Sequence, residues 1–489
     1  MAEPLGTQAN PLRVAIIGSG PSGFYAAAHL QSQADLITEI DMFDRLPTPY
    51  GLVRGGVAPD HQKIKSVTKA YERIAADENF RFYGHVEFGK DVTHADLVNY
   101  YHAIIYAVGA QTDRRMDIPG EDLPGSHPAT EFVAWYNAHP DFADHPFDLT
   151  QENVAVIGLG NVAMDVIRIL ARTPDELTET DIADYALDKL KRSSVKNIYV
   201  LGRRGPAQAA FTNPEIKELG ELDDASVIVA QEEVTLDPVS RQYVDSGEDK
   251  VATKNVEILK GFAAQGGDTG KPRKIIMRFC VSPVEIIGTD RVEAIKIVKN
   301  ALVPDDKGNL KAVPTDQFET IPVGLVFRSV GYHGVALPGV PFDDKKGTIP
   351  NTLGRVLTAP KTGEQVIGDY VVGWIKRGPS GIIGTNKPDS VETVNSLLED
   401  VKAGKTLAPA TPNRAKLEAL LHERGIQYVT FADWHFLDMA EQERGEFRNA
   451  PRLKFSRVDE MLKAIKERKT ATQEMQAAAA ATPPPLPAD

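Results

Sequence analysis

The chain has 489 residues, with 68 acidic against 55 basic side chains and a formal net charge of −13. This excess of negative charge argues against non-specific binding to nucleic acid or to an anionic membrane surface, so any anion site must be local. The single cysteine, Cys280, excludes an internal disulfide, a CxxC redox pair and a four-cysteine iron–sulfur site. Its surroundings, IIMRFCVSP, indicate a small apolar strand residue.

The N-terminal residues 1–13 lack both the apolar core of a signal peptide and the repeated arginines of a transit peptide. No apolar run approaches the roughly 18 residues that span a bilayer. We therefore expect a cytoplasmic protein without a membrane span and without a nucleic-acid partner.

The first predicted unit is a strand, turn and helix over residues 13–31, RVAIIGSGPSGFYAAAHLQ. Gly18, Gly20 and Gly23 have GxGxxG spacing, in which the first glycine permits the turn, the second admits a pyrophosphate, and the third lets helix and strand pack closely. The helix N-terminus offers free N–H groups to the phosphates. This pattern predicts dinucleotide binding rather than a simple glycine turn.

The next predicted strand, residues 37–45, ends near Asp44. A carboxylate at this place can accept hydrogen bonds from both ribose hydroxyls, and it would repel a 2′-phosphate. The first unit is therefore expected to bind FAD or NAD rather than NADP. A Pro/Gly stretch (46–61), a helix (63–77), a strand or hairpin (81–89) and an apolar strand (102–110) follow.

A second strand, turn and helix is predicted over residues 153–172, with Gly158, Gly160 and Ala163 at the three fingerprint positions. The strand after it, residues 197–204, ends in Arg203 and Arg204 where the first unit ends in Asp44. Arginine forks bind phosphate bidentately, so the 2′-phosphate of NADP is the expected partner. Hydrogen bonds of about 1.5–3 kcal/mol each would favour NADP over NAD by roughly 10²–10⁴-fold. A solvated pair or a salt bridge is the alternative.

The order of these units predicts an α/β fold with two Rossmann-like dinucleotide-binding domains of three-layer type, the NADP domain inserted in a discontinuous FAD domain. The expected boundaries are 1–112 and 330–469 for the FAD domain, 113–329 for the NADP domain, and 470–489 for a disordered Ala/Pro tail. Residues 226–329 look β-rich, with an exposed loop over 235–253, and a helix is expected to start near Asp389.

Two dinucleotide sites of opposite charge in one chain favour a flavoenzyme that binds FAD tightly and is visited by NADPH. A disulfide reductase would need a cysteine pair, which the chain lacks. The electron acceptor must then be external: a small molecule, oxygen or a redox protein.

The motifs resemble the adrenodoxin reductase-like family of ferredoxin–NADP reductases, most closely its stand-alone mycobacterial-type members. The resemblance rests on VAIIGSGPSGFYAA, LPTPYGLVRGGVAPDH, YAVGAQTDR, GNVAMDVIRILAR, GRRGPAQAAF, SVGYHG and GWIKRGPSGIIGTNK, and it extends over nearly the whole chain before the tail. It implies FAD, NADP(H) and delivery of single electrons to a ferredoxin or similar acidic iron–sulfur protein.

The resemblance also implies site residues. Those for FAD, with the fingerprint glycines, are Gly18, Gly20, Ser22, Gly23, Asp44, Leu52, Val86, Trp374, Gly381, Ile382 and Ile383. Those for NADP are Arg114, Gly160, Asn161, Val162, Ala163, Arg203, Arg204, Glu215 and again Gly381. Glu215 cannot bind phosphate, but it could accept from a carboxamide or orient an arginine. No residue is assigned to a metal.

His61 matches a family histidine that lies near the flavin and is proposed to relay protons or to couple to the partner. Asp165, from the helix of the second unit, is expected nearby, and both are the candidate catalytic residues. For the ferredoxin, the basic residues Lys271, Arg273 and Lys274 are the candidate docking patch, with a solvated loop as the alternative.

Two other functions stay open from the sequence. One is an NADPH-dependent flavin monooxygenase or another small-substrate flavin oxidoreductase. The other is the electron-input subunit of an amidotransferase-type synthase, although such subunits carry cysteine clusters that are absent here.

Overall fold

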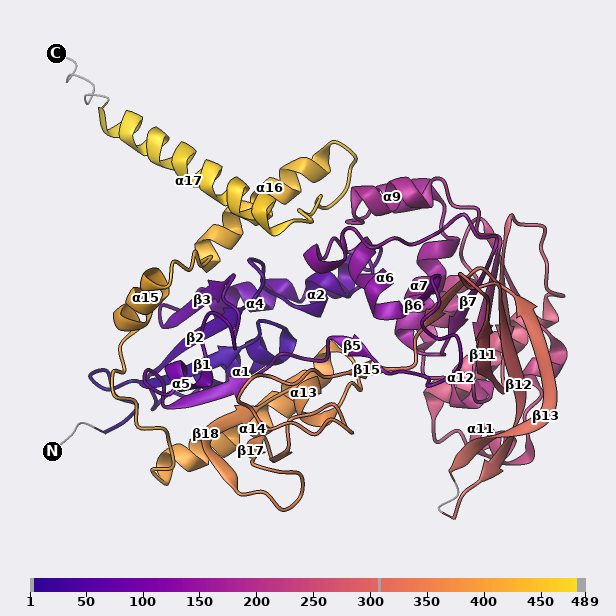
Figure 1. Cartoon of the computed structure of the whole chain (residues 1–489), viewed down its shortest axis with the longest axis horizontal. Helices are drawn as coiled ribbons and strands as arrows, with labels where there is room; N and C mark the ends of the chain where they lie inside the picture. The colour runs from indigo at the N-terminus through magenta and orange to yellow at the C-terminus, as the bar shows by residue number, and fades with distance from the viewer. Residues whose placement is uncertain (1–3, 307–308, 482–489) are drawn as a thin grey trace.

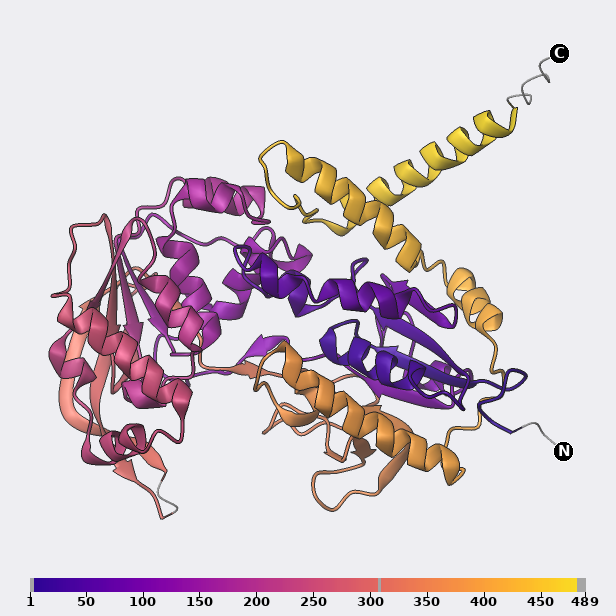
Figure 2. The ribbon, with the colours of Figure 1, turned by 180° about the vertical axis from the view of Figure 1, so that it is seen from behind.

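A computed structural model describes residues 4–306 and 309–481, and the side chains as far as residue 474. Figures 1 and 2 show two lobes joined by paired strands near the middle, with a C-terminal helix projecting from the first lobe. No helix within the described ranges is long and apolar enough to cross a membrane.

The first lobe is built on a seven-stranded sheet whose order is β16-β17-β18-β4-β1-β2-β3. Its parallel part comprises β1 (Leu12–Ile17), β2 (Thr38–Asp44), β3 (Phe80–Gly84), β4 (Ala103–Tyr106) and β18 (Gln365–Val371). Two short strands, β16 (Asn351–Thr352) and β17 (Arg355–Leu357), add an antiparallel edge. The strands therefore come from both ends of the chain, so this lobe is discontinuous in sequence.

The helices of the first lobe cover both faces of this sheet. Their bounds are α1 (Pro21–Gln31), α2 (Leu52–Gly55), α3 (Gln62–Lys65), α4 (Thr68–Ala75), α5 (His94–Leu97), α13 (Trp374–Arg377), η4 (Ile383–Thr385), α14 (Asn386–Lys402), α15 (Arg414–Glu423), α16 (Phe431–Glu446) and α17 (Val458–Ala481). Helices α1 and α14 pack against each other, and the Ser390 hydroxyl of α14 donates 2.9 Å to the Ser22 carbonyl of α1. The C-terminal part of the chain thus buttresses the first glycine turn.

The second lobe contains a parallel six-stranded sheet in the order β6-β14-β7-β8-β10-β9. The strands are β6 (Ser126–Pro128), β7 (Asn153–Ile157), β8 (Asn197–Leu201), β9 (Ala225–Val229), β10 (Arg273–Arg278) and β14 (Leu325–Arg328). An antiparallel sheet of β11 (Val281–Ile287), β12 (Ala294–Pro304) and β13 (Leu310–Pro322) packs on one face through Ala155, Leu201 and Ile295. Helices pack on the other face, which gives three layers, ββα.

The helical layer and its connections have these bounds: α6 (Ala129–Tyr136), η1 (Pro140–Phe142), α7 (Asn161–Ala171), α8 (Pro174–Thr178), α9 (Asp184–Leu190), η2 (Pro206–Gln208), α10 (Asn213–Leu219), η3 (Gln231–Val234), α11 (Pro238–Ser246) and α12 (Lys250–Ala264). Between the lobes, β5 (Thr112–Asp113) pairs antiparallel with β15 (Tyr332–His333). The chain therefore leaves the first lobe and returns to it side by side (Figure 1).

Two local predictions were wrong, and one predicted helix begins slightly earlier than expected. Residues 235–253 are not a loop, because Asp237 and Asp249 cap α11 and α12 by accepting backbone N–H groups in their first turns. Cys280 lies between β10 and β11 with φ +52°, so it is a turn residue. Helix α14 begins at Asn386, three residues before Asp389.

The C-terminal tail also differs from the prediction. Residues 470–481 continue α17 as a helix, since alanine, glutamine, glutamate and methionine all have high helix propensity. The N-terminal half of this helix is anchored by Met461 and Ile465, both buried in the first lobe. Residues 482–489 lie outside the described ranges.

Candidate functional site

The first glycine turn, between β1 and α1, has one open position. A Cβ on Gly18 (φ +104°) would lie 2.6 Å from the Ala107 carbonyl oxygen, and one on Gly23 would lie 2.5 Å from the Gly18 oxygen. A Cβ on Gly20 would meet no atom within 4 Å. The outer glycines are therefore required by the chain's own packing, whereas Gly20 keeps space free in front of the α1 N-terminus, as a pyrophosphate needs.

Asp44 is fixed at the C-terminal end of β2, beside this turn. Its Oδ2 accepts from the Ser19 backbone N–H at 3.0 Å and from the Ser19 hydroxyl at 2.5 Å, and its Oδ1 accepts from the Leu46 N–H at 3.0 Å. The Val86 N–H donates to the Asp44 carbonyl at 2.9 Å, which places Val86 at the same strand end. The carboxylate is thus held in position by the turn itself.

Leu52 lies near the same glycine turn, because the preceding residue, Gly51, packs against it. A Cβ on Gly51 (φ +49°) would lie 2.9 Å from the Gly20 Cα, so the start of α2 passes close over the glycine turn. Leu52 itself is 37% exposed although it is apolar, which suits a residue that a cofactor covers.

The segment expected at the flavin ring folds back toward α1. A Cβ on Gly373 would lie 2.6 Å from the hydroxyl of the buried Ser22, so Trp374 begins α13 directly beside the first turn. The Trp374 ring lies 5.0 Å from the Tyr332 ring, and its Nε1 donates to the Ser380 carbonyl at 3.2 Å. Gly381 has φ +79° and is followed by Ile382, which is 63% exposed, and by Ile383, which packs on the first-lobe core.

The second glycine turn, between β7 and α7, repeats the pattern of the first. Gly158 (φ +130°) has no room for a Cβ beside the Ser329 carbonyl, and Ala163 is fully buried at the third position. A Cβ on Gly160 would again meet nothing within 4 Å. Asn161 Oδ1 accepts from the Thr212 N–H at 2.9 Å and so ties this turn to the start of α10, while the half-buried Val162 packs on the core. The second turn therefore also leaves room for a phosphate.

Arg203 and Arg204, after β8, have fixed backbones and free side chains. Their carbonyls accept from Asn300 Nδ2 at 2.9 Å and from the Cys280 N–H at 3.1 Å. Both residues are exposed, and within the described ranges neither guanidinium forms an ion pair or a side-chain hydrogen bond. The alternative that they form a salt bridge is therefore not supported, and the two cations lie at the same end of the sheet as the second glycine turn.

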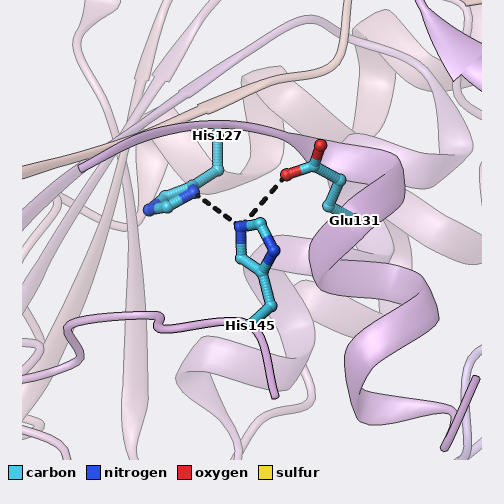
Figure 3. Close-up of side chains that lie close together, drawn as sticks. All are labelled: His127, Glu131 and His145. Atoms are coloured by element: carbon cyan, nitrogen blue, oxygen red, sulfur yellow. Dashed lines mark hydrogen bonds and ion pairs between the residues drawn. The ribbon is translucent and has the colours of Figure 1, made fainter. Parts of the chain in front are cut away.

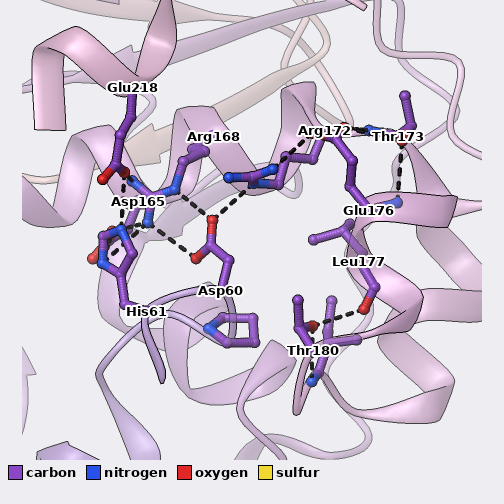
Figure 4. Close-up of polar contacts among 12 residues, drawn as sticks. Asp60, His61, Asp165, Arg168, Arg172, Thr173, Glu176, Leu177, Thr180 and Glu218 are labelled. Carbon is purple, nitrogen blue, oxygen red and sulfur yellow. Dashed lines mark hydrogen bonds and ion pairs between the residues drawn. The ribbon is translucent and has the colours of Figure 1, made fainter. Parts of the chain in front are cut away.

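A buried polar cluster joins the two lobes around Arg168 of α7, which has no solvent exposure (Figure 4). Arg168 donates from Nε to Asp60 Oδ2 at 2.6 Å, from Nη2 to Asp165 Oδ1 at 2.5 Å, and from Nη1 to Glu215 Oε2 at 2.9 Å. Asp60 belongs to the first lobe and the other three residues to the second. Removing one partner of such a buried network typically costs about 3–5 kcal/mol, so the cluster holds the lobes together.

His61 lies at the edge of this cluster. Its Nε2 is 3.0 Å from Glu218 Oε2, while its Nδ1 is 3.4 Å from Arg168 Nη2 and 3.8 Å from Asp165 Oδ1. Because a guanidinium can only donate, Nδ1 accepts and the neutral ring carries its proton on Nε2, facing Glu218. The predicted pair His61 and Asp165 is thus brought together, with Arg168 between them.

The pKa values of the carboxyl groups in the cluster are shifted in opposite directions. Burial, followed by the charge of Asp165, raises the pKa of Glu215 to about 7, against the opposing effect of Arg168. Burial also raises the pKa of Asp165. Burial alone would raise the pKa of Asp60 too, but hydrogen bonds and charge from Arg168 outweigh it and leave that pKa well below its usual range. The cluster therefore contains both a firmly ionised carboxylate and one that titrates near neutrality.

Sequence reasoning missed Asp60, Arg168 and Glu218 as members of this site. A usable indication existed, because Asp165 and Arg168 are three residues apart on an otherwise apolar helix, as are Glu215 and Glu218 on α10. Glu215 contacts Arg168, so of its two predicted roles the structure shows the arginine contact.

Two further predicted sites lie elsewhere. Arg114 is exposed at the crossing strands, where its N–H donates to the Gly331 carbonyl at 2.8 Å and the residue lines a pocket of about 180 Å³. The basic segment lies at the start of β10, where Lys271 donates to the Leu222 carbonyl and Lys274 pairs with Asp268 at 2.5 Å. Since β10 runs parallel to β8, this segment is at the opposite end of the sheet from Arg203.

Two Rossmann-type lobes with open glycine turns define a two-domain oxidoreductase that uses dinucleotide cofactors. In agreement, the family described as pyridine nucleotide-disulphide oxidoreductase matches residues 12–199. The chain belongs to the adrenodoxin reductase-like ferredoxin–NADP reductase family. It is 46% identical to the NADPH-ferredoxin reductase FprA of Mycobacterium leprae, over 92% of this chain and 97% of that protein.

A more distant sequence relative and a solved structure support the same family. The mitochondrial NADPH:adrenodoxin oxidoreductase of Arabidopsis thaliana is 38% identical over 93% of this chain and 95% of its own length. The solved structure of Mycobacterium tuberculosis FprA in complex with NADPH superposes with a TM-score of 0.87 at 44% identity, and covers 93% of this chain and all of the other.

Proposed function

We propose that this chain is an NADPH–ferredoxin reductase, which takes electrons from NADPH and passes them through FAD to a ferredoxin-type iron–sulfur protein. The observation that carries the proposal is the pair of open glycine turns that end in opposite charges, Asp44 in one lobe and Arg203 with Arg204 in the other. The names of the related proteins support the ferredoxin as acceptor.

The residues of the two turns fit these cofactors. The open space at Gly20 and the fixed carboxylate of Asp44 suit the pyrophosphate and ribose of FAD, and the open space at Gly160 with two free guanidiniums suits NADP(H). Bound FAD would supply the conversion of a hydride from NADPH into single electrons for the partner. The chain's own part is to hold the two nucleotides, to select the phosphorylated one at β8, and to keep the lobes in register through Arg168.

A stopped-flow experiment tests this function. The yellow protein is mixed with NADPH or NADH and then with a ferredoxin. We expect fast bleaching with NADPH, much slower bleaching with NADH, and rapid reoxidation by the ferredoxin. NADPH oxidation that an organic compound stimulates, while ferredoxin does not, would instead favour the small-substrate oxidoreductase.

For His61 and Asp165 we propose a positioning role within the interlobe cluster. Hydride transfer needs no general acid or base, so His61→Gln should slow NADPH-to-ferredoxin transfer by less than the roughly 100-fold that loss of an acid–base catalyst costs. The measurement is single-turnover flavin reduction and reoxidation, with the exposed His435→Gln as the matched control. An unchanged rate together with unchanged ferredoxin affinity would refute a role for His61.

The docking surface for the ferredoxin stays a prediction, as does the cytoplasmic location. For the patch of Lys271, Arg273 and Lys274, the triple change to glutamate should weaken ferredoxin binding and flatten its salt dependence, because each reversal opposes an acidic partner. Affinity is measured over a salt series, with the exposed Lys402, Lys405 and Lys416 of the first lobe reversed as the control. If affinity and salt dependence both persist in the patch variant, the ferredoxin docks elsewhere; the local partners of Lys271 and Lys274 already reduce their free charge.

A further inference from the structure

The first lobe is called the FAD lobe from here on, and the second lobe the NADP lobe. A second cluster of titratable side chains lies in the NADP lobe, away from the glycine turns. It joins His127 of β6, Glu131 of α6 and His145 from the loop after η1 (Figure 3). His145 Nε2 is 3.3 Å from His127 Nδ1 and 3.2 Å from Glu131 Oε2. Three separate elements therefore bring one imidazole or carboxylate atom each to within 4.8 Å of one another.

These separations match a particular coordination geometry. Tetrahedral Zn²⁺ has bonds of about 2.0–2.2 Å to histidine nitrogen and carboxylate oxygen, so its ligand atoms lie about 3.3–3.5 Å apart. We propose that His127, Glu131 and His145 form a binding site for Zn²⁺ that is independent of the electron-transfer site. Two nitrogens and one carboxylate oxygen are a ligand set typical of zinc, whereas Mg²⁺ prefers oxygen ligands alone.

The site is held ready by aromatic packing. The ring centroids of His127 and His145 each lie 4.7 Å from that of the buried Phe147, which fixes how both rings point. The side chains of His145 and Glu131 are 29% and 28% exposed, so an ion can enter. Glu131 also lines the pocket of about 180 Å³ at the crossing strands, so this carboxylate can be reached from solvent.

Nearby charges do not block the site. The cations whose charges act on these ligands are Arg328, which is tied to Glu121 by a 2.5 Å ion pair, and Lys189, which lies over the Trp135 ring. The contrast is the other trio with metal-ligand spacing, His61, Glu215 and Glu218. There Arg168 already supplies a positive charge, 2.9 Å from Glu215 and 3.7 Å from Glu218, and it would repel a second cation.

Zinc at this site would also stiffen contacts between the lobes. Asp141 of η1 and Asp144 of the loop that carries His145 pair with Arg45 at 2.6 Å and with Arg457 at 2.5 Å, both from the first lobe. A bond from the ion to His145 restrains this loop from the NADP side. We therefore expect Zn²⁺ to raise the midpoint of thermal unfolding of the chain.

The test titrates ZnCl₂ into the metal-stripped, FAD-loaded full chain by isothermal titration calorimetry. We expect one ion per chain, a raised melting midpoint and no competition from excess Mg²⁺. His145→Ala and the isosteric Glu131→Gln should each weaken binding by about 100-fold or more, since even outer-shell changes cost about 10–100-fold. His61→Gln and the exposed His435→Ala should bind as the parent does.

Several outcomes would overturn the site. They are the absence of saturable zinc binding to the parent chain, parent-like binding by both His145→Ala and Glu131→Gln, and loss of binding in His61→Gln. The last would assign the ion to the Arg168 cluster. Unfolding midpoints without metal show whether each variant is folded, and Co²⁺ absorption beyond the flavin bands reports tetrahedral coordination as a second readout.

Discussion

The two lobes contain the same kind of glycine turn, but the strand that follows the turn and its helix ends in a negative charge in one lobe and in positive charges in the other. In the FAD lobe, Asp44 accepts three hydrogen bonds from Ser19 and Leu46, so its carboxylate is part of the turn. In the NADP lobe, the backbone carbonyls of Arg203 and Arg204 accept hydrogen bonds, and in the described part of the chain their guanidiniums form no ion pair or side-chain hydrogen bond. One strand end is hydrogen-bonded within the chain, and the other carries two exposed guanidiniums.

This difference suits a resident and a visiting cofactor. A carboxylate that the protein already orients loses little freedom when it binds a ribose, whereas two mobile arginines gain their partners only when a phosphate arrives. Under the proposed assignment the contrast would also explain selectivity between the two nucleotides: Asp44 would repel a 2′-phosphate, and the arginine pair would attract one.

The largest effect is expected from removing the arginine pair. Replacing Arg203 and Arg204 together by alanine should reduce the NADPH over NADH preference by roughly 10²–10⁴-fold, because two charge-assisted phosphate contacts are lost. The ratio of kcat/KM for the two nucleotides measures this, with the exposed Arg192→Ala as control. An unchanged ratio would mean that the arginine pair has another role. The contrast between the two lobes would then no longer account for nucleotide selectivity.

A smaller effect is expected on the pH dependence of stability, because the NADP lobe contains the buried Glu215. Its folded-state pKa of about 7 is raised above the ordinary 4.5, so its contribution to stability is full below pH 4.5 and is lost as the pH rises through 7. The loss amounts to at most about 3 kcal/mol. Glu215→Gln should lack this fall, as measured by the free energy of unfolding from pH 4.5 to 8.

The control for this change is Glu221→Gln, at an exposed residue on the same side of the lobe that pairs with Lys217. It should keep the pH profile of the parent chain. If Glu215→Gln also keeps that profile, the carboxyl titrates elsewhere and the charge balance around Arg168 has been assigned wrongly.

The smallest effects are expected from adding one methyl group to each glycine turn, which tests whether the two turns bind different cofactors. Gly20→Ala and Gly160→Ala each add a methyl that meets no protein atom, so both variants should fold like the parent. A methyl in the path of a phosphate should cost about 1–3 kcal/mol of binding, from FAD in the first variant and from NADPH in the second. FAD content and NADPH titration measure the two losses, and Gly261→Ala, an open helical position, serves as the control. Loss of the same cofactor from both variants would show that the turns are not independent.

The sequence predicted the parts of the molecule that depend on local pattern. The spacing of Gly18, Gly20 and Gly23 and the residue that ends the next strand determine a dinucleotide turn and its charge, because both lie within one βαβ unit. The same local logic failed at residues 235–253, where the caps Asp237 and Asp249 were overlooked among turn-forming residues.

Only the tertiary structure decided which distant charges meet. Asp60 and Arg168 are 108 residues apart and belong to different lobes, and His127 and His145, 18 residues apart, meet where both rings pack on Phe147. A pattern in one segment cannot specify such pairs, because burial and the path of the chain through β5 and β15 set the distance between the groups. The sequence alone thus determined two dinucleotide turns of opposite charge, and the fold decided how the lobes that carry them are joined.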